Sequence, residues 1–544
     1  MSTVPAWAWQ LALLVGLVAS IGVLLALARP GGRWGQRVRT HLVLGLPLGT
    51  VLTVLFVLGV YLFVQNGLHH WYRPTQIPYR AWSYAYPLGM IVAPFAHGGS
   101  AHITGNLLGT VTFGVLAEYA WSHFPTQRGE STFGSLRTNP FARAVAFFVG
   151  ALAVGLLTSF FSLGPVIGFS GVVFAFVGLA LVRYPLATVG VVVGGDVVSL
   201  VYHAATNPET TARASSRFVT PWFAGVAIQG HYLGLLLGVV AGIALVRRRG
   251  ASPAPARLWF ATLVFGTSQA LWALYVPQTT STYVLFRALG AVVLLLLAAL
   301  VTAAACTGDR TLVPQIDLAR REAAVGLVVA LLVATAVVSL PLNLLTVGRA
   351  DVGAQETVHV RDYTVYYAEG VPNQLVPAVN VSVAGESTQV NASGVIVASE
   401  RRSIWWPEVP ASRLASRGHA TIYLGGPGWR TPVRATRPGW RLLGGETTYK
   451  VYLQAGDRER ELSFASPPAT LDGQLAGKNV SIAPTETGFD LVVSRANRTV
   501  GRAPIPQNGT TEVGGLRFNR TKRELTVIDN GTRLPIAARA TGED

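Results

Sequence analysis

Two apolar stretches of this chain begin with residue types that could carry out acyl-transfer chemistry. Ser170 lies in Gly168-Phe169-Ser170-Gly171, at the start of an apolar stretch that ends at Arg183. His231 opens a second stretch, and His102 and Asn106 lie at the start of a third. Polar groups inside lipid-embedded helices are costly, so a convergent set of this kind indicates a functional site.

The residue types define the chemistry. Ser170 is a candidate nucleophile, and it needs a base to become reactive. His231 could take the serine proton and return it to a leaving amine. His102 and Asn106 are four residues apart and share a helix face, so they could donate to an oxyanion, assisted by the Ser170 amide. Since no acidic third member is evident, we expect a dyad.

These groups should lie at a similar depth in a membrane. The charged residue at the end of each stretch marks the inner membrane boundary. Along the helix, Ser170 lies about 20 Å from this boundary, and His231 and His102 lie about 24 Å from it. The hydrocarbon core is about 30 Å thick, which predicts a site in its outer third. The stretch 168–183 is short for a crossing, so its outer end should border a cavity that admits water. Gly234 and Gly238 would let the helix of His231 approach that of Ser170 closely.

The elements that position these residues are predicted to be membrane helices. The chain of 544 residues is 51% hydrophobic and 13% charged, too few charges to cover a soluble surface. Its single cysteine, Cys306, can form no internal disulfide, and a small buried apolar residue is the expected role. The apolar stretches predict ten membrane crossings, near residues 6–28, 42–64, 102–121, 142–163, 168–183, 186–203, 229–246, 258–276, 283–306 and 323–347.

Positive charge predicts the orientation of these crossings. Residues 1–350 contain 21 Lys/Arg and 7 Asp/Glu, and much of the excess lies between apolar stretches. This favours a positive-inside topology and argues against nucleic-acid binding. Arg29, Arg33, Arg37 and Arg39 place the first loop in the cytoplasm, although the outer loops have exceptions such as Arg73, Arg80, Arg213 and Arg217. The N-terminus and residues 350–544 are then expected outside the cell.

The first crossing has an alternative interpretation. Ala26-Leu27-Ala28 imitates a signal-peptide cleavage site. A retained helix is favoured because the apolar core is long and no positive charge precedes it.

Residues 350–544 differ from the rest of the chain. β-branched and aromatic segments such as Tyr363–Tyr367 and Thr448–Tyr452 alternate with Gly, Pro and Asn clusters, which predicts one or two sandwich-like β units. Asn-x-Ser/Thr sequons occur only here, which supports an extracellular, glycosylated position. They lie at Asn380, Asn391, Asn479, Asn497, Asn508, Asn519 and Asn530.

Together these motifs resemble the rhomboid family of intramembrane serine proteases. The family pattern His-x4-His-x3-Asn, Gly-x-Ser-Gly and His-x2-Gly-x3-Gly is matched at His97, His102, Asn106, Gly168, Ser170, Gly171, His231, Gly234 and Gly238. Glu118 matches an acidic position of the second core helix, and Phe174 stands where the family often has a tyrosine stacked on the histidine. The resemblance covers about residues 42–246.

The resemblance implies a six-helix core, a Ser170–His231 dyad, and His102 and Asn106 as oxyanion donors. His97, Gly168, Gly171, Phe174, Gly234, Gly238 and Glu118 would support the site. It also implies transmembrane protein substrates within the lipid bilayer and no metal or cofactor. The expected organisation is an extra helix and loop (1–41), a protease core (42–250), three further helices (251–349) and an outer β domain (350–544). The sequence gives no indication of oligomeric state.

Two other classes of function remain open. A catalytically silent rhomboid-like protein could hold membrane helices for quality control or trafficking. Asp196, beside Gly194-Gly195 in the middle of an apolar stretch, could instead mark the ion path of a transporter.

Overall fold

The computed structural model describes residues 5–28, 32–125, 130–207, 227–250, 252–277, 283–308, 311–313, 318–347, 356–374, 382–383, 386–387, 391–529 and 532–540. The chain divides into a helical unit, residues 1–276 and 284–344, and a second unit, residues 277–283 and 345–544. Some residues discussed above fall outside the described ranges, namely Arg29, Arg213, Arg217, Asn380 and Asn530.

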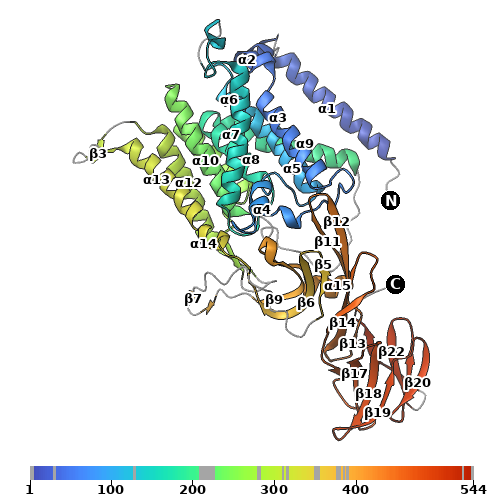
Figure 1. Cartoon of the computed structure of the whole chain (residues 1–544). Coiled ribbons are helices and arrows are strands. Elements are labelled where there is room, and N and C mark those ends of the chain that lie inside the picture. The colour runs from blue at the N-terminus through green and yellow to red at the C-terminus, as the bar shows by residue number, and fades with distance from the viewer. Residues whose placement is uncertain are drawn as a thin grey trace. The chain divides into compact units, whose positions relative to one another are not determined.

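The helical unit is a bundle of apolar helices (Figure 1). Its helices are α1 (Ala6–Ala28), α2 (Arg33–His41), α3 (Leu48–Gly59), α4 (Pro87–Val92), α5 (Ser100–Gly109), α6 (Val115–Trp121), α7 (Pro140–Phe160), α8 (Ser170–Arg183), α9 (Pro185–Thr206), α10 (Ile228–Arg248), α11 (Pro255–Ser268), α12 (Arg287–Cys306), α13 (Arg320–Val337) and α14 (Leu340–Asn343). Two π-helical segments continue this pattern: η2 (Val60–Val64) extends α3, and η4 (Thr110–Gly114) joins α5 to α6. Short hairpins lie between α11 and α12 (β1, Tyr275–Pro277; β2, Tyr283–Leu285) and between α12 and α13 (β3, Thr311–Val313; β4, Leu318–Ala319).

The helical unit makes the chain a multi-pass membrane protein. In the described part of the chain, six helices are long and apolar enough to cross a membrane, and Leu48–Val64 and Ser170–Arg183 are shorter apolar helices. Each of the ten stretches predicted from sequence contains a helix. The total of ten crossings stays a prediction.

Three predicted crossings differ in extent from their helices, although Arg320–Asn343 is still long and apolar enough to cross a membrane. The stretch 258–276 is helical only to Ser268, because the chain turns at Ala270, whose φ is 56°. The stretch 283–306 becomes helical only at Arg287, and the stretch 323–347 breaks after Val337. Thr267-Ser268-Gln269 and Ser339-Leu340-Pro341 interrupt two of these stretches, but a hydropathy average over a window of about 19 residues passes over such short interruptions.

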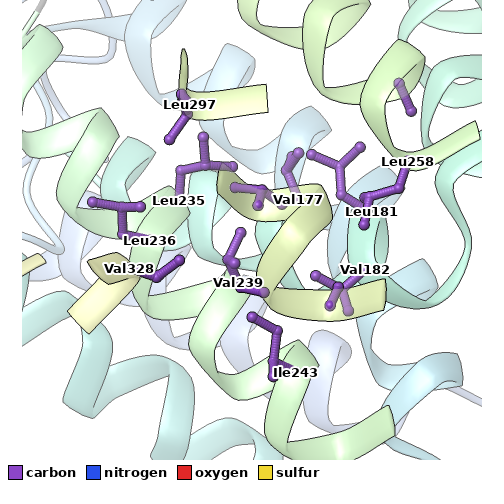
Figure 2. Packing of buried hydrophobic residues seen from close by; sticks show 14 of the residues in the cluster. Val177, Leu181, Val182, Leu235, Leu236, Val239, Ile243, Leu258, Leu297 and Val328 are labelled. Atoms are coloured by element: carbon purple, nitrogen blue, oxygen red, sulfur yellow. The ribbon is translucent and has the colours of Figure 1, made fainter. Parts of the chain in front are cut away.

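Helix α8 lies at the centre of this unit. Its residues 171–178 are all buried, as expected for a helix that is apolar on every face. Helix α10 packs along it, and the later helices extend the same apolar core. Figure 2 shows this cluster, in which Val177 of α8, Val239 of α10 and Val328 of α13 take part. The three-dimensional core therefore joins the predicted protease helices to the helices that follow them.

The second unit is rich in antiparallel β-structure. One sheet has the order β10-β9-β6-β5, a larger one the order β11-β12-β14-β13-β23-β22-β21-β20 with β15 beside β14, and a third the order β16-β17-β18-β19. The strands are β5 (Val358–Val360), β6 (Tyr363–Pro372), β9 (Asn391–Ser399), β10 (Ile404–Pro410), β11 (His419–Gly426), β12 (Trp429–Thr436), β13 (Gly439–Leu442), β14 (Thr447–Ala455), β15 (Glu461–Ala465), β16 (Ala469–Thr470), β17 (Asn479–Pro484), β18 (Phe489–Arg495), β19 (Arg498–Pro504), β20 (Gly509–Val513), β21 (Leu516–Arg520), β22 (Glu524–Asp529) and β23 (Thr532–Arg539). A further short pair consists of β7 (Ser382–Val383) and β8 (Glu386–Ser387), and α15 (Ala411–Arg417) follows β10. The β-rich content is consistent with the sandwich-like domain predicted from sequence.

Candidate active site

Ser170 is the first residue of α8. The first N–H groups of a helix have no acceptor within the helix, and its positive dipole end favours a nearby negative charge. Gly168, two residues earlier, has a φ of 128°, in the region that only glycine adopts readily. The glycine before the serine is therefore required by the turn that leads into α8.

His231 reaches this helix terminus from α10. Its Nε2 lies 2.8 Å from Ser170 Oγ, within hydrogen-bond distance. When the serine hydroxyl donates to Nε2, the neutral ring carries its proton on Nδ1. His231 Nδ1 is buried and has no hydrogen-bond partner among the described residues. The structure thus brings the two predicted residues together as a pair, and no described residue forms a hydrogen bond with the second imidazole nitrogen.

Glycines allow this close approach of α8 and α10. A Cβ added to Gly234 would lie 2.0 Å from the carbonyl oxygen of Gly171, and one added to Gly238 would lie 2.0 Å from that of Ala175. Gly171 itself faces Thr158 of α7, where an added Cβ would lie 2.9 Å from the side chain. Side chains larger than hydrogen at Gly234 and Gly238 would separate the helices that carry Ser170 and His231, and one at Gly171 would push α8 away from α7.

Phe174 stacks on the face of the His231 ring. The two rings stack with centroids 4.2 Å apart and planes 12° from parallel. Phe265 of α11 packs edge-on against Phe174, with centroids 5.3 Å apart. Phe265 was not found by sequence reasoning, because an apolar residue in an apolar helix gives no signal of its neighbours.

His102 and Asn106 lie together beside Gly168. A Cβ added to Gly168 would lie 2.6 Å from His102 Nε2 and 3.5 Å from Asn106 Nδ2. The amide of Gly98 donates to His102 Nδ1 over 3.3 Å, so the neutral ring carries its proton on Nε2. Asn106 Nδ2 is buried without a hydrogen-bond partner in the described residues. Two N–H donors are therefore directed toward the segment that precedes Ser170.

His97 precedes the first residue of α5 in the chain, and its ring packs against that of His102. It is fully buried, and its ring centroid is 5.1 Å from that of His102 in an edge-on contact. Gln65 holds its backbone: the His97 amide donates to Gln65 Oε1 over 2.7 Å, and Gln65 Nε2 donates to the His97 carbonyl over 2.8 Å. His97 thus packs against His102, and no hydrogen bond joins it to Ser170.

Glu118 has its hydrogen-bond partners at the start of α3 and not at the serine. Its carboxylate accepts hydrogen bonds from the amides of Gly49 and Thr50, each over 2.7 Å, and from the Thr50 hydroxyl. His123 Nε2 lies 2.7 Å from the same carboxylate. A fully buried carboxylate at a helix N-terminus caps the orphan N–H groups and complements the dipole. Glu118 therefore contributes to the stability of the helical bundle.

A small cavity lies next to the serine. Its volume is about 30 Å³, and Ser170, His231, Gly168, Thr158 and Ser162 are among the residues that line it. A polar cavity larger than about 10–15 Å³ can hold a water molecule. The cavity could therefore hold the water that hydrolysis needs.

Asp196 belongs to a different part of the unit. It is exposed at the middle of α9, and it is not among the residues that line the cavity. No described residue forms a hydrogen bond or ion pair with it.

A serine and a histidine paired between two helices of a multi-pass membrane protein define a candidate intramembrane serine hydrolase. Residues 84–248 match the family model of the Rhomboid domain, so the chain contains a domain that is similar to the rhomboid family. Members of this family are generally serine proteases, although some are inactive. The match begins after the predicted first core helix, residues 42–64. No curated protein and no solved structure matches the chain.

Proposed function

We propose that this protein is an active intramembrane serine endopeptidase that cleaves membrane-spanning substrates through a Ser170–His231 dyad. The observation that carries the proposal is the 2.8 Å contact between His231 Nε2 and Ser170 Oγ, inside a domain of the rhomboid family. A nucleophile within hydrogen-bond reach of its base is the arrangement that makes a serine hydroxyl reactive.

The reaction follows from this pair. Ser170 Oγ attacks the carbonyl carbon of the scissile bond while its proton passes to His231 Nε2. The tetrahedral intermediate collapses by breaking the C–N bond, and His231 returns the proton to the leaving nitrogen. A water molecule from the adjacent cavity then loses a proton to His231 and attacks the acyl carbon. The second tetrahedral intermediate collapses by breaking the bond from carbon to Ser170 Oγ, and His231 returns the proton to Oγ, which regenerates the serine and releases the new carboxyl end.

The developing oxyanion needs donors that are in place before the reaction. Asn106 Nδ2 is a buried donor without a partner in the described residues, and the hydrogen bond from Gly98 to Nδ1 leaves the Nε2–H of His102 free to donate. The backbone amide of Ser170 at the α8 terminus is the third donor. Losing one such donor typically costs about 100- to 1,000-fold in kcat.

The protein is further proposed to lie in the cell membrane with its β-rich unit outside the cell. The positive charges of the loops and the sequons of residues 350–544 support this orientation independently of each other. The site would then open toward the outer membrane face.

The alternative is a catalytically silent family member that binds membrane helices. The intact serine–histidine contact favours activity, since a binding protein has no need of this pair. Reaction with a fluorophosphonate probe separates the two, because only an activated serine is labelled efficiently.

The test uses the full chain in liposomes with a reporter membrane protein. We expect Ser170→Ala and His231→Ala to reduce cleavage to the background rate and to abolish probe labelling, while membrane insertion is unchanged. Ser268→Ala is the matched control, since that hydroxyl donates to the Phe265 carbonyl within its own helix and accepts from the side chain of the next residue, Gln269, with no link to the dyad. Cleavage by Ser170→Ala at the wild-type rate would disprove the proposed mechanism.

A further inference from the structure

The wall of the cavity beside Ser170 is formed in part by the cavity loop, residues 161–169, which connects α7 to α8. Ser162 of this loop lines the cavity and is 3% exposed. A Cβ added to Gly230 would lie 2.7 Å from Ser162 Oγ, so the loop packs directly against the residue that precedes His231. The position of this loop therefore bears on the position of the imidazole.

Two carboxamides hold the backbone of the loop and the end of α7. Asn343 Nδ2 donates to the carbonyls of Phe160 and Ser162, over 2.9 and 3.1 Å. Gln229 Nε2 donates to the Phe161 carbonyl over 2.8 Å, and its Oε1 accepts from the Leu163 amide over 2.9 Å. We call these two side chains the loop clamp. They bind four consecutive residues of the chain through the backbone.

One arm of the clamp comes from outside the Rhomboid domain. Asn343 is the last residue of α14, while the family match ends at residue 248. Gln229 Nε2 also donates to the Thr335 carbonyl of α13 over 2.7 Å, which ties the start of α10 to the same late helices. The site thus depends on a part of the chain that the family domain does not contain.

Asn343 is itself held in place. It is 2% exposed, and its carbonyl accepts from the Tyr84 amide over 2.7 Å and from Ser83 Oγ over 3.3 Å. Tyr84 Oη donates to the Phe160 carbonyl over 2.6 Å, which closes the network around the end of α7. A buried network in which each member bonds the next is rigid, because displacement of one group leaves others unsatisfied.

We propose that Asn343 is a positioning residue for the hydrolysis, through which helices α13 and α14 hold the cavity loop against the start of α10. This inference rests on the proposed protease activity. Without the Asn343 amide, the Ser162 carbonyl of the loop and the Phe160 carbonyl at the end of α7 each lose a donor, and Ser162 no longer fixes the distance between the loop and Gly230. Asn343 is not among the residues that line the cavity beside Ser170, so we expect the effect to fall on kcat and not on KM.

The first experiment compares Asn343→Ala and Asn343→Asp with the wild type, as full chains in liposomes. We expect Asn343→Ala to lower kcat about tenfold, the effect of two hydrogen bonds, with KM within about twofold. Asn343→Asp should lower kcat at least as much, because a carboxylate oxygen would face two carbonyl oxygens in place of a donor.

Ser339→Ala is the matched control. Ser339 is buried one turn before Asn343, and its hydroxyl bonds only the Ala336 carbonyl in the same segment. We expect kcat within about twofold of the wild type for this variant. If Asn343→Ala lowers the unfolding temperature but leaves kcat of the folded protein unchanged, Asn343 is only a helix cap and the proposal is wrong.

A second measurement does not depend on catalysis. In a Cys306→Ala background, Ser162→Cys places a thiol on the cavity loop, and its rate of reaction with a maleimide reports the opening of the loop. We expect Asn343→Ala to raise this rate about fivefold or more, and Ser339→Ala to leave it unchanged. Equal rates in the three proteins would overturn the clamp even if the protease is active. If the wild-type protein neither cleaves substrate nor reacts with the fluorophosphonate probe at Ser170, the proposed function is wrong. The maleimide rates still show whether Asn343 holds the cavity loop in place.

Discussion

Replacing Gly234 with Ala should inactivate the protein although neither reacting group is changed. The added Cβ would lie 2.0 Å from the Gly171 carbonyl oxygen, while real Cβ contacts essentially never fall below 3.0 Å. Helices α8 and α10 must therefore separate by about 1 Å. The contact between Ser170 Oγ and His231 Nε2 would lengthen from 2.8 Å to nearly 4 Å, beyond the reach of a hydrogen bond.

The expected loss follows from this displacement. A misplacement of about 1 Å can cost about 100-fold in rate, or about 2.7 kcal/mol of barrier. Helix propensity acts in the opposite direction, since Ala is favoured over Gly by about 1 kcal/mol in a helix interior. A loss of activity therefore reports the helix separation and not a weaker helix.

The assay measures kcat/KM on a reporter membrane substrate together with the rate of fluorophosphonate labelling. Gly150→Ala on α7 is the matched control, because an added Cβ there meets nothing within 4 Å. We expect wild-type activity from the control. If Gly234→Ala keeps more than half of the wild-type activity, the close approach of the two helices does not position the dyad.

Three further predictions concern other parts of the chain. Glu118→Ala leaves the buried donors at the start of α3 unpaired, so the free energy of unfolding should fall by about 3–5 kcal/mol. Thermal denaturation in detergent measures this loss, and an unchanged unfolding temperature would contradict it. In the β-rich unit, burial raises the pKa of Asp362, but the hydrogen bonds and charge of Arg402 outweigh it and lower the pKa below its usual value. The ionised Asp362 therefore stabilises the fold above about pH 4, and this stabilisation is lost as the pH falls. The Asp362→Asn variant lacks this ionisable group, so its resistance to limited proteolysis should fall less in acid than that of the wild type. Asn497 is exposed at a turn, with a φ of 64°. If the β-rich unit lies outside the cell, Asn497→Gln should remove one glycan, which is seen as a shift in mass. The absence of a mass shift at every sequon in a glycosylating host would count against that location.

Much of the candidate site could be predicted from the sequence because its members are polar residues in apolar surroundings. Ser170 and His231 stand out for that reason, and their hydrogen bond joins residues 61 positions apart. Phe174 was recognised only through the family pattern, and its stack on His231 agrees with that pattern.

Other parts could not be predicted, for identifiable reasons. The carboxylate of Glu118 bonds amides 68 and 69 residues away, and no local pattern in the sequence connects them. Gln229 could have been noticed as a polar residue two positions before His231, but Asn343 lies outside every motif. The early end of α11 was missed because the polar residues before the turn at Ala270 are few, and the apolar residues 271–276 that follow extend the hydrophobic stretch beyond the helix.

The amino-acid sequence alone determined which segments are apolar helices and which polar residues interrupt them, because hydropathy and residue type are local properties. It also separated the helical part from the β-rich part, through composition and side-chain alternation. Only the tertiary structure decided which polar groups meet. That outcome depends on how closely α8 and α10 approach at their glycines, and on which distant carboxamides reach the backbone of the cavity loop. Such contacts are set by the packing of helices from separate parts of the chain, and no stretch of sequence contains them.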